Sequence, residues 1–192
     1  MTRVAGLILA GGRSSRMGRD KSFVPLLGRR LIDHVLERLS PQVSALAISA
    51  NDQTYGELGF PVLEDAQADR PGPLAGIAAG LVWARSVGAD HLVTTPCDTP
   101  FLPVDLVSRL SPGPSVAESP GGLEPLFACW PVSAIEVLDA ALERGDLAVY
   151  RLLQVLGARI VPCPASDPPW WLNLNAEAEL QAAQARLGAG DG

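Results

Sequence analysis

The stretch RVAGLILAGG, residues 3–12, decides the fold class, because a short run of Val, Leu and Ile ends there in two adjacent glycines. Such a run predicts a buried β-strand, and the paired glycines predict a loop directly after it. In residues 31–39 apolar side chains recur at helical spacing, and Asp33 places a favourable charge in the first turn. Strand, loop and helix in this order are typical of an α/β protein.

The chain continues this alternation. We expect further strands at residues 43–49, 60–65 and 90–98 and a helix rich in small residues at 72–86. Strands that alternate with helices indicate a mostly parallel central sheet with helices on both faces. Such sheets bind ligands beyond the carboxyl ends of their strands, which here carry Gly11, Gly12, Asp65 and Asp98.

The second half of the chain is less regular. Residues 101–110 predict a short helix with Pro103 near its first position, and the Pro/Gly-rich residues 111–122 predict a loop with at most one brief strand. Further elements are expected as a strand at 123–130, helices at 132–145 and 148–156, a strand at 158–162 and a last helix from about residue 176. We expect one domain over residues 1–192, with one half at about 1–110 and the other at about 120–187.

Composition excludes several classes of protein. No run of about 18 apolar residues appears, so no membrane span is expected, and the start of the chain does not resemble a secretory signal. The net charge of -6 disfavours a nucleic-acid binder. Three cysteines without CxxC spacing disfavour a zinc site or a disulfide framework, so we expect a cytoplasmic protein.

The loop after the first strand is basic in this acidic chain. LAGGRSSRMGRDK, residues 9–21, holds four cationic side chains within nine residues. Glycines let backbone N–H groups approach phosphate oxygens, and Arg16 and Lys21 could supply positive charge. The spacing matches neither the GxxxxGK[ST] of a P-loop nor the GxGxxG of a dinucleotide fold. Glycine and charge alone therefore leave a solvated surface turn equally open.

The same stretch resembles LAGGxSxRMGxDK, a signature of nucleotidyltransferases with a Rossmann-like fold. Three more stretches are similar, in order and spacing, to the molybdenum cofactor guanylyltransferase family: LEDAQADRPGPLAGIAAGL (63–81), TTPCDTPFLP (94–103) and NLNAEAEL (173–180). The resemblance spans nearly the whole chain. It implies a mostly parallel α/β fold and transfer of GMP from Mg-GTP to molybdopterin, with release of pyrophosphate.

The resemblance also implies roles for single residues. The backbone of Leu9, Ala10 and Gly11 would contact guanine and ribose, and the loop from Gly12 onward would wrap the phosphates. Lys21 corresponds to the family lysine that contacts the phosphates of GTP, and Arg16 would add a second cationic donor.

Two acids and a glycine follow from the same resemblance. Asp65 corresponds to an aspartate that takes part in GTP binding, although an acid at a strand end is also a common helix cap or loop residue. Asp98 corresponds to the magnesium ligand, and its alternative is to cap the helix that begins near Pro103. Gly76 would lie beside the guanine, or serve only close packing of helix on sheet.

Other positions depart from the family pattern or have a plainer alternative. Ser49 stands where the family has an asparagine that contacts GTP, with Asn51 two places on. Asn173 and Asn175 would face the pterin, although Asn175 is also a good helix N-cap. Leu147 and Ala148 stand where the family is often basic, which puts the contact to the pterin phosphate in doubt.

Rival functions remain open at this level. A molybdopterin cytidylyltransferase or another small nucleotidyltransferase would share the first motif, and a silent nucleotide-binding module would lack Lys21 or Asp98. The acceptor phosphate is an anion, so no general base is needed. We expect Mg²⁺ as cofactor, GTP and molybdopterin as substrates, no nucleic acid or membrane, and a monomer with at most transient contacts to other molybdenum cofactor proteins.

Overall fold

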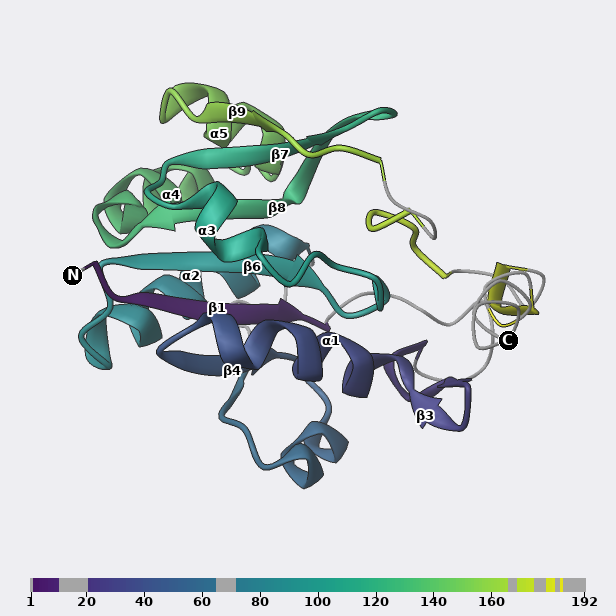
Figure 1. Cartoon of the computed structure of the whole chain (residues 1–192). Coiled ribbons are helices and arrows are strands. Elements are labelled where there is room, and N and C mark those ends of the chain that lie inside the picture. Colours follow the sequence, from purple (N-terminus) through teal and green to yellow (C-terminus); the bar gives the residue numbers. More distant parts are fainter. Residues whose placement is uncertain are drawn as a thin grey trace.

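The computed structural model describes residues 2–10, 21–64, 72–165, 169–174, 179–181 and 184. Its centre is a seven-stranded sheet in the order β5-β4-β1-β6-β8-β7-β9 (Figure 1). The strands are β1 (Val4–Leu9), β4 (Ala45–Ser49), β5 (Val62–Leu63), β6 (His91–Pro96), β7 (Ser115–Ser119), β8 (Gly122–Pro131) and β9 (Arg159–Pro162). Only β8 runs antiparallel to its neighbours in this sheet. The mostly parallel sheet expected from the sequence is confirmed.

Strand β1 lies inside the sheet, between β4 and β6. It pairs in parallel with β4 on one side and with β6 on the other, and the side chains of Ala5, Leu7 and Ile8 are fully buried. A strand covered on both faces needs a nearly continuous apolar run, which is what residues 4–10 provide. The carboxyl ends of β1, β4, β5 and β6 therefore meet at one edge of the sheet.

Helices cover both faces of the sheet, as predicted (Figure 1). They are α1 (Leu31–Leu39), α2 (Pro73–Ser86), α3 (Leu106–Leu110), α4 (Ile135–Glu143) and α5 (Val149–Val155). Helices α1 and α3 contribute to one buried apolar cluster, and α2, α4 and α5 contribute to another on the opposite face. No helix in the described ranges has both the length and the apolarity that crossing a bilayer requires.

Helix α1 shows how the local sequence sets an element. Its apolar side chains recur on one face, and Leu31, Ile32, Val35, Leu36 and Leu39 are all buried. At its start the Asp33 carboxylate accepts hydrogen bonds from the backbone N–H of Arg30 at 3.1 Å and from its guanidinium at 2.8 Å. This bonding to Arg30 lowers the pKa of Asp33. The predicted charge in the first turn is confirmed.

A third, smaller apolar cluster connects distant parts of the chain. It joins Leu26 and Leu31, beside a short hairpin, to Phe101 after β6 and to Leu174 and Leu180 near the C-terminus. The short elements that complete the fold are β2 (Pro25–Leu26), β3 (Arg29–Arg30) and the 3-10 helices η2 (Lys21–Phe23), η3 (Ser40–Gln42), η4 (Gln53–Leu58) and η5 (Val132–Ala134). The cluster brings the C-terminal segment to the hairpin beyond the carboxyl edge of the sheet (right side of Figure 1).

The second half of the chain differs from expectation in two places. Residues 115–119 form β7, the one brief strand that was expected within residues 111–122, and its hairpin with β8 places it inside the sheet between β8 and β9. Helix α3 begins at Leu106 with Asp105 as N-cap, after a turn closed by the Leu106 N–H on the Pro103 carbonyl. The helix expected at 132–145 opens with the 3-10 turn η5. The last helix, expected from residue 176, lies mostly outside the described residues.

Candidate active site

The end of β1 is fixed between two neighbouring strands. The N–H of Ala10 donates to the Ser49 carbonyl at 2.9 Å, and the Leu9 carbonyl accepts from the N–H of Cys97 at 3.1 Å. Leu9 and Ala10 are both buried. The Ala10 N–H is thus already hydrogen-bonded within the sheet. A ligand at this edge would contact other atoms of Leu9 and Ala10 and not this N–H.

Lys21 and Asp98 come together at this edge from two separate segments. Lys21 opens η2, and Asp98 lies two residues beyond β6. Burial raises the pKa of the half-buried Asp98 carboxyl, the Lys21 ammonium acts in the opposite sense, and the Glu179 carboxylate raises the pKa further. Lys21, Asp98 and Glu179 are therefore electrostatic neighbours although they lie far apart in the sequence.

The C-terminal segment is attached to Asp98 through the backbone. The N–H of Leu174 donates to the Asp98 carbonyl at 3.1 Å, and the Leu174 side chain is buried in the third apolar cluster. Asn173 precedes it with an exposed side chain. Asp98 does not cap α3, because the N-cap of that helix is Asp105. The capping alternative for Asp98 is therefore excluded.

Ser49 and Asn51 differ in accessibility. Ser49 is the last residue of β4 and is only 4% exposed, and its carbonyl bonds to Ala10. Asn51, two residues further on, is exposed. This chain therefore has a serine where the family pattern has an asparagine, and its nearest asparagine, Asn51, lies at the surface two residues later.

Helix α2 begins at the same edge, because it follows β5 in a parallel crossover. Its first turn carries Gly72 and Pro73, both exposed, and Gly76 is buried one turn later. The free N–H groups and the helix dipole give the start of a 14-residue helix a partial positive charge that suits an anion. This edge therefore combines Lys21, a helix N-terminus and the Asp98 carboxylate.

Several predicted site residues lie outside the described residues, namely Gly11, Gly12, Arg16, Asp65 and Asn175. The described residues that come together at the edge are Leu9, Ala10, Lys21, Ser49, Gly76, Asp98 and Asn173. Their roles remain predictions.

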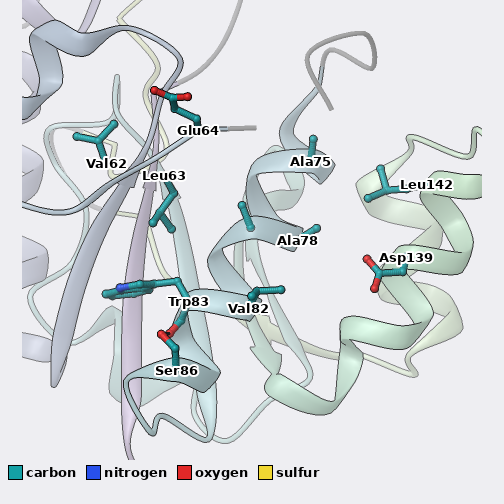
Figure 2. A pocket seen from close by; sticks show the side chains of 11 residues that line it. Val62, Leu63, Glu64, Ala75, Ala78, Val82, Trp83, Ser86, Asp139 and Leu142 are labelled. Carbon is teal, nitrogen blue, oxygen red and sulfur yellow. Dashed lines mark hydrogen bonds between the residues drawn. The ribbon is translucent and has the colours of Figure 1, made fainter. Parts of the chain in front are cut away.

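A cavity of about 560 Å³ lies elsewhere, along α2 between β5 and α4 (Figure 2). Val62, Leu63 and Glu64 approach it from the sheet, and Asp139 and Leu142 from α4. Its lining is mainly apolar, and its charged groups are the carboxylates of Glu64 and Asp139. Carboxylates accept hydrogen bonds and repel phosphates, so this cavity is unsuited to a triphosphate.

Neither Cys129 nor Cys163 offers an activated thiol. Burial raises the pKa of Cys129 to about 11 and also raises the pKa of Cys163, so both thiols stay protonated at neutral pH. Cys97, Cys129 and Cys163 form no disulfide.

Sequence reasoning missed two features of the site. Glu179 lies within the NLNAEAEL stretch, but nothing in its local pattern marks it as a neighbour of Asp98. Next to Lys21 in the sequence, Ser22 takes part in a hydrogen-bonded chain that connects Tyr55, Ser22 and Cys97. Its members are 33 and 75 positions apart in the sequence, so only the fold reveals the chain.

Comparison with known proteins gives consistent results. The model of the family described as MobA-like NTP transferase domain matches residues 6–161. A relative from Rhodobacter capsulatus named molybdenum cofactor guanylyltransferase is 46% identical over 188 residues, covering 96% of this chain and 97% of the relative. A relative of the same name from Acidiphilium cryptum (strain JF-5) is 39% identical, covering 96% of this chain and 95% of the relative.

Among solved structures, molybdopterin-guanine dinucleotide biosynthesis protein A from Archaeoglobus fulgidus superposes with a TM-score of 0.74 at 24% identity. The match covers 96% of this chain and 99% of that protein. At this identity the likeness establishes the fold alone.

Proposed function

The chain belongs to the MobA-like NTP transferase family, and on that premise we propose that it is a molybdenum cofactor guanylyltransferase, which moves GMP from GTP to molybdopterin. The chain is a nucleotidyltransferase. Guanine is chosen as the base because relatives that are 39–46% identical over nearly the whole chain share the name molybdenum cofactor guanylyltransferase. The site geometry supports the reaction type, since Lys21 and Asp98 are neighbours at the ligand-binding edge of the sheet.

The proposed chemistry is one in-line displacement. An oxygen of the terminal phosphate on molybdopterin forms a bond to the α-phosphorus of GTP, and the bond from that phosphorus to the bridging oxygen breaks. Pyrophosphate leaves with the electron pair. The attacking oxygen is already anionic, so no side chain needs to remove a proton, in keeping with the protonated thiols of Cys129 and Cys163.

Lys21 and the basic loop would supply charge to this reaction. We assign the Lys21 ammonium to the phosphates of GTP, where negative charge grows on the leaving group, and Arg16 to the same task. The backbone of Gly11 and Gly12 would cradle phosphate oxygens. Fixed positive charge aimed at developing negative charge is the main source of rate in such transfers.

Asp98 suits a magnesium ion held together with substrate. Among the described residues, no three His, Cys, Asp or Glu side chains form a group able to bind a metal alone. Mg²⁺ is commonly bound by one or two carboxylates plus phosphate oxygens and water, which fits Asp98 with Glu179 nearby. When bound, the ion would neutralise phosphate charge and orient the phosphates. Asp98 would hold it at the carboxyl end of β6.

The nucleoside and the pterin would occupy opposite halves. We propose a single domain in which the half at about 1–110 binds GTP through Leu9, Ala10, Ser49, Asp65 and Gly76. The half at about 120–187 would receive molybdopterin, with Asn173 and Asn175 on its side of the site. The Leu174 N–H that bonds to the Asp98 carbonyl supports this arrangement, because it places Asn173 beside Asp98.

We also propose that the enzyme works as a monomer in the cytoplasm. Three cysteines that form no disulfide suit a reducing compartment, which supports this location.

Pyrophosphate release tests the proposal. We expect release with GTP, magnesium and molybdopterin together, and little release when any one of the three is omitted. CTP, ATP and UTP serve as matched nucleotides. Faster turnover with CTP would show a cytidylyltransferase, and binding of GTP without any pyrophosphate release would show a silent nucleotide-binding module.

A further inference from the structure

We propose that Tyr55 positions the two catalytic side chains, Lys21 and Asp98, through a buried hydrogen-bonded chain. The chain runs from the Tyr55 hydroxyl to the Ser22 hydroxyl and on to the Cys97 thiol. Ser22 directly follows Lys21, and Cys97 directly precedes Asp98. This inference rests on the proposed function, since it concerns the geometry in which Lys21 and Asp98 act.

The contacts in the chain are short, and the one between Tyr55 and Ser22 is buried. The Tyr55 Oη and Ser22 Oγ atoms are 2.6 Å apart, and Ser22 Oγ lies 3.1 Å from Cys97 Sγ. Tyr55 is 1% exposed and Ser22 is fully buried. Hydrogen bonds shielded from water are electrostatically stronger than exposed ones, and a buried hydroxyl without its partner is costly.

The donors and acceptors follow one direction along the chain. The Tyr55 hydroxyl donates across the 2.6 Å contact to Ser22, and it also lies 3.4 Å from the Ala10 carbonyl. Ser22 accepts that bond and donates its own proton to the Cys97 sulfur. Each hydroxyl that donates onward becomes a better acceptor, so the two bonds strengthen each other.

Contacts with its own neighbours hold Tyr55 in place. It lies in η4, whose N-cap is Asp52, and the Asp52 carboxylate accepts from the Thr54 N–H at 2.9 Å. The Tyr55 ring contacts the Phe23 ring with centroids 5.0 Å apart. The turn Lys21–Phe23 is therefore fastened to Tyr55 twice, once through the Ser22 hydroxyl and once through the Phe23 ring.

This arrangement has a consequence for catalysis. Cys97 is also fixed from the β1 side, because its N–H donates to the Leu9 carbonyl. The bond from Ser22 to Cys97 thus joins the backbone that carries Lys21 to the backbone that carries Asp98. Displacements of about 1 Å in a catalytic group can reduce rates by about 100-fold, so this bond bears on turnover more than on binding of GTP.

The test compares Tyr55→Phe, Ser22→Ala and the double variant with the wild-type enzyme. We expect Tyr55→Phe to lower kcat by about tenfold, with KM for GTP within about twofold of wild type. Because the two hydroxyls act in one chain, the double variant should lose little more than the worse single variant. Cys97→Ser, which keeps an acceptor, should retain more of kcat than Cys97→Ala.

Two control variants remove hydroxyls outside the chain. Tyr150→Phe removes the exposed phenol that accepts from Gln154 on α5, and Ser115→Ala removes a fully buried hydroxyl that donates to the Leu110 carbonyl. Both should keep kcat, although Ser115→Ala should lower the melting temperature. This separates a loss of stability from a loss of positioning.

The outcomes are distinct. An unchanged kcat in a folded Tyr55→Phe variant overturns the inference, as do additive losses in the double variant. If the wild-type protein shows no guanylyl transfer, the proposed function fails, and amide hydrogen exchange still tests the chain. Faster exchange of residues 21–24 in Tyr55→Phe, with β1 and β6 unchanged, then supports the positioning, and identical exchange overturns it.

Discussion

Lys21 is the only lysine in the sequence, and the structure makes its ammonium an electrostatic neighbour of the Asp98 carboxylate. Its position was predictable because the basic, glycine-rich loop follows a strand. The closeness of Glu179 to Asp98 was not predictable, because it depends on the apolar cluster that brings Leu180 to Leu26. Local sequence thus identified the charged residue, while tertiary packing determines what surrounds it.

Replacing Lys21 tests its charge. We expect Lys21→Ala to lower kcat/KM for GTP by about 100-fold or more, because a fixed donor aimed at developing negative charge is lost. Steady-state pyrophosphate release measures the effect. Arg29→Ala is a matched control, since Arg29 is exposed and pairs with Glu37 at 2.8 Å. A decrease in kcat/KM of less than threefold for Lys21→Ala, or an equal decrease for Arg29→Ala, would contradict the assigned role.

A second prediction at this scale uses the single ε-amine of the wild-type protein. Pyridoxal phosphate should form an imine with Lys21, releasing water, and borohydride should reduce the imine to a stable amine that mass spectrometry locates. We expect Mg-GTP to protect Lys21 and leave labelling of the terminal amine unchanged. Equal labelling of Lys21 with and without nucleotide would show that GTP binds elsewhere.

The elements show where sequence patterns are reliable. Strands β1, β4 and β6 and helices α1 and α2 lie close to the predicted ranges, because buried parallel strands and amphipathic helices carry their signal locally. Strand β7 was expected only as one brief strand within a loop, because Pro112, Pro114 and Pro120 flank it. Its place between β8 and β9 depends on tertiary pairing. Turn residues mark the ends of a segment and say little about what the segment pairs with.

The start of α1 gives a prediction that depends on pH. The pKa of Asp33 is lower in the folded protein than in the unfolded chain, so its stabilisation is complete above the unfolded value and is lost as pH falls through the folded one. Asp33→Ala should cost about 1 kcal/mol at neutral pH, as typical of a lost cap. Urea unfolding at decreasing pH measures this.

The pH dependence provides the check on Asp33. The gap between wild type and Asp33→Ala should begin to close at the ordinary pKa of Asp and close fully as pH falls through the lower folded-state pKa, and a constant gap would refute the mechanism. Glu37→Ala is the control, because the Glu37–Arg29 pair is exposed and should contribute less than about 0.5 kcal/mol.

Helix α2 depends on a close approach to the sheet. A Cβ at Gly80 would lie 2.5 Å from a methyl carbon of Leu7 and 3.0 Å from one of Leu92, and both leucines are fully buried. Gly80→Ala gains about 1 kcal/mol of helix propensity but adds about 1–3 kcal/mol of overpacking, so a net loss is expected. Gly56→Ala, where the added Cβ meets nothing within 4 Å, should be neutral or stabilising. Urea unfolding compares the two, and a more stable Gly80→Ala would contradict the packing described.

On the scale of the whole molecule, one sheet serves both proposed halves. Strand β6 pairs with β1 on one side and with β8 on the other, so the end of β6, where Asp98 follows, lies at the junction of the halves. The C-terminal segment returns to this point through the Leu174 N–H on the Asp98 carbonyl. A group that must contact both substrates belongs at such a junction, which is where the proposed reaction uses Asp98.

The most direct measurement follows the phosphorus atoms of GTP. The enzyme is incubated with magnesium, molybdopterin and GTP labelled with ³²P at either the α or the γ position. We predict that α-label appears in the pterin product and γ-label in pyrophosphate, in equal amounts. Label from the γ position in the pterin product, or GTP hydrolysis with an unlabelled pterin, would contradict guanylyl transfer at this site.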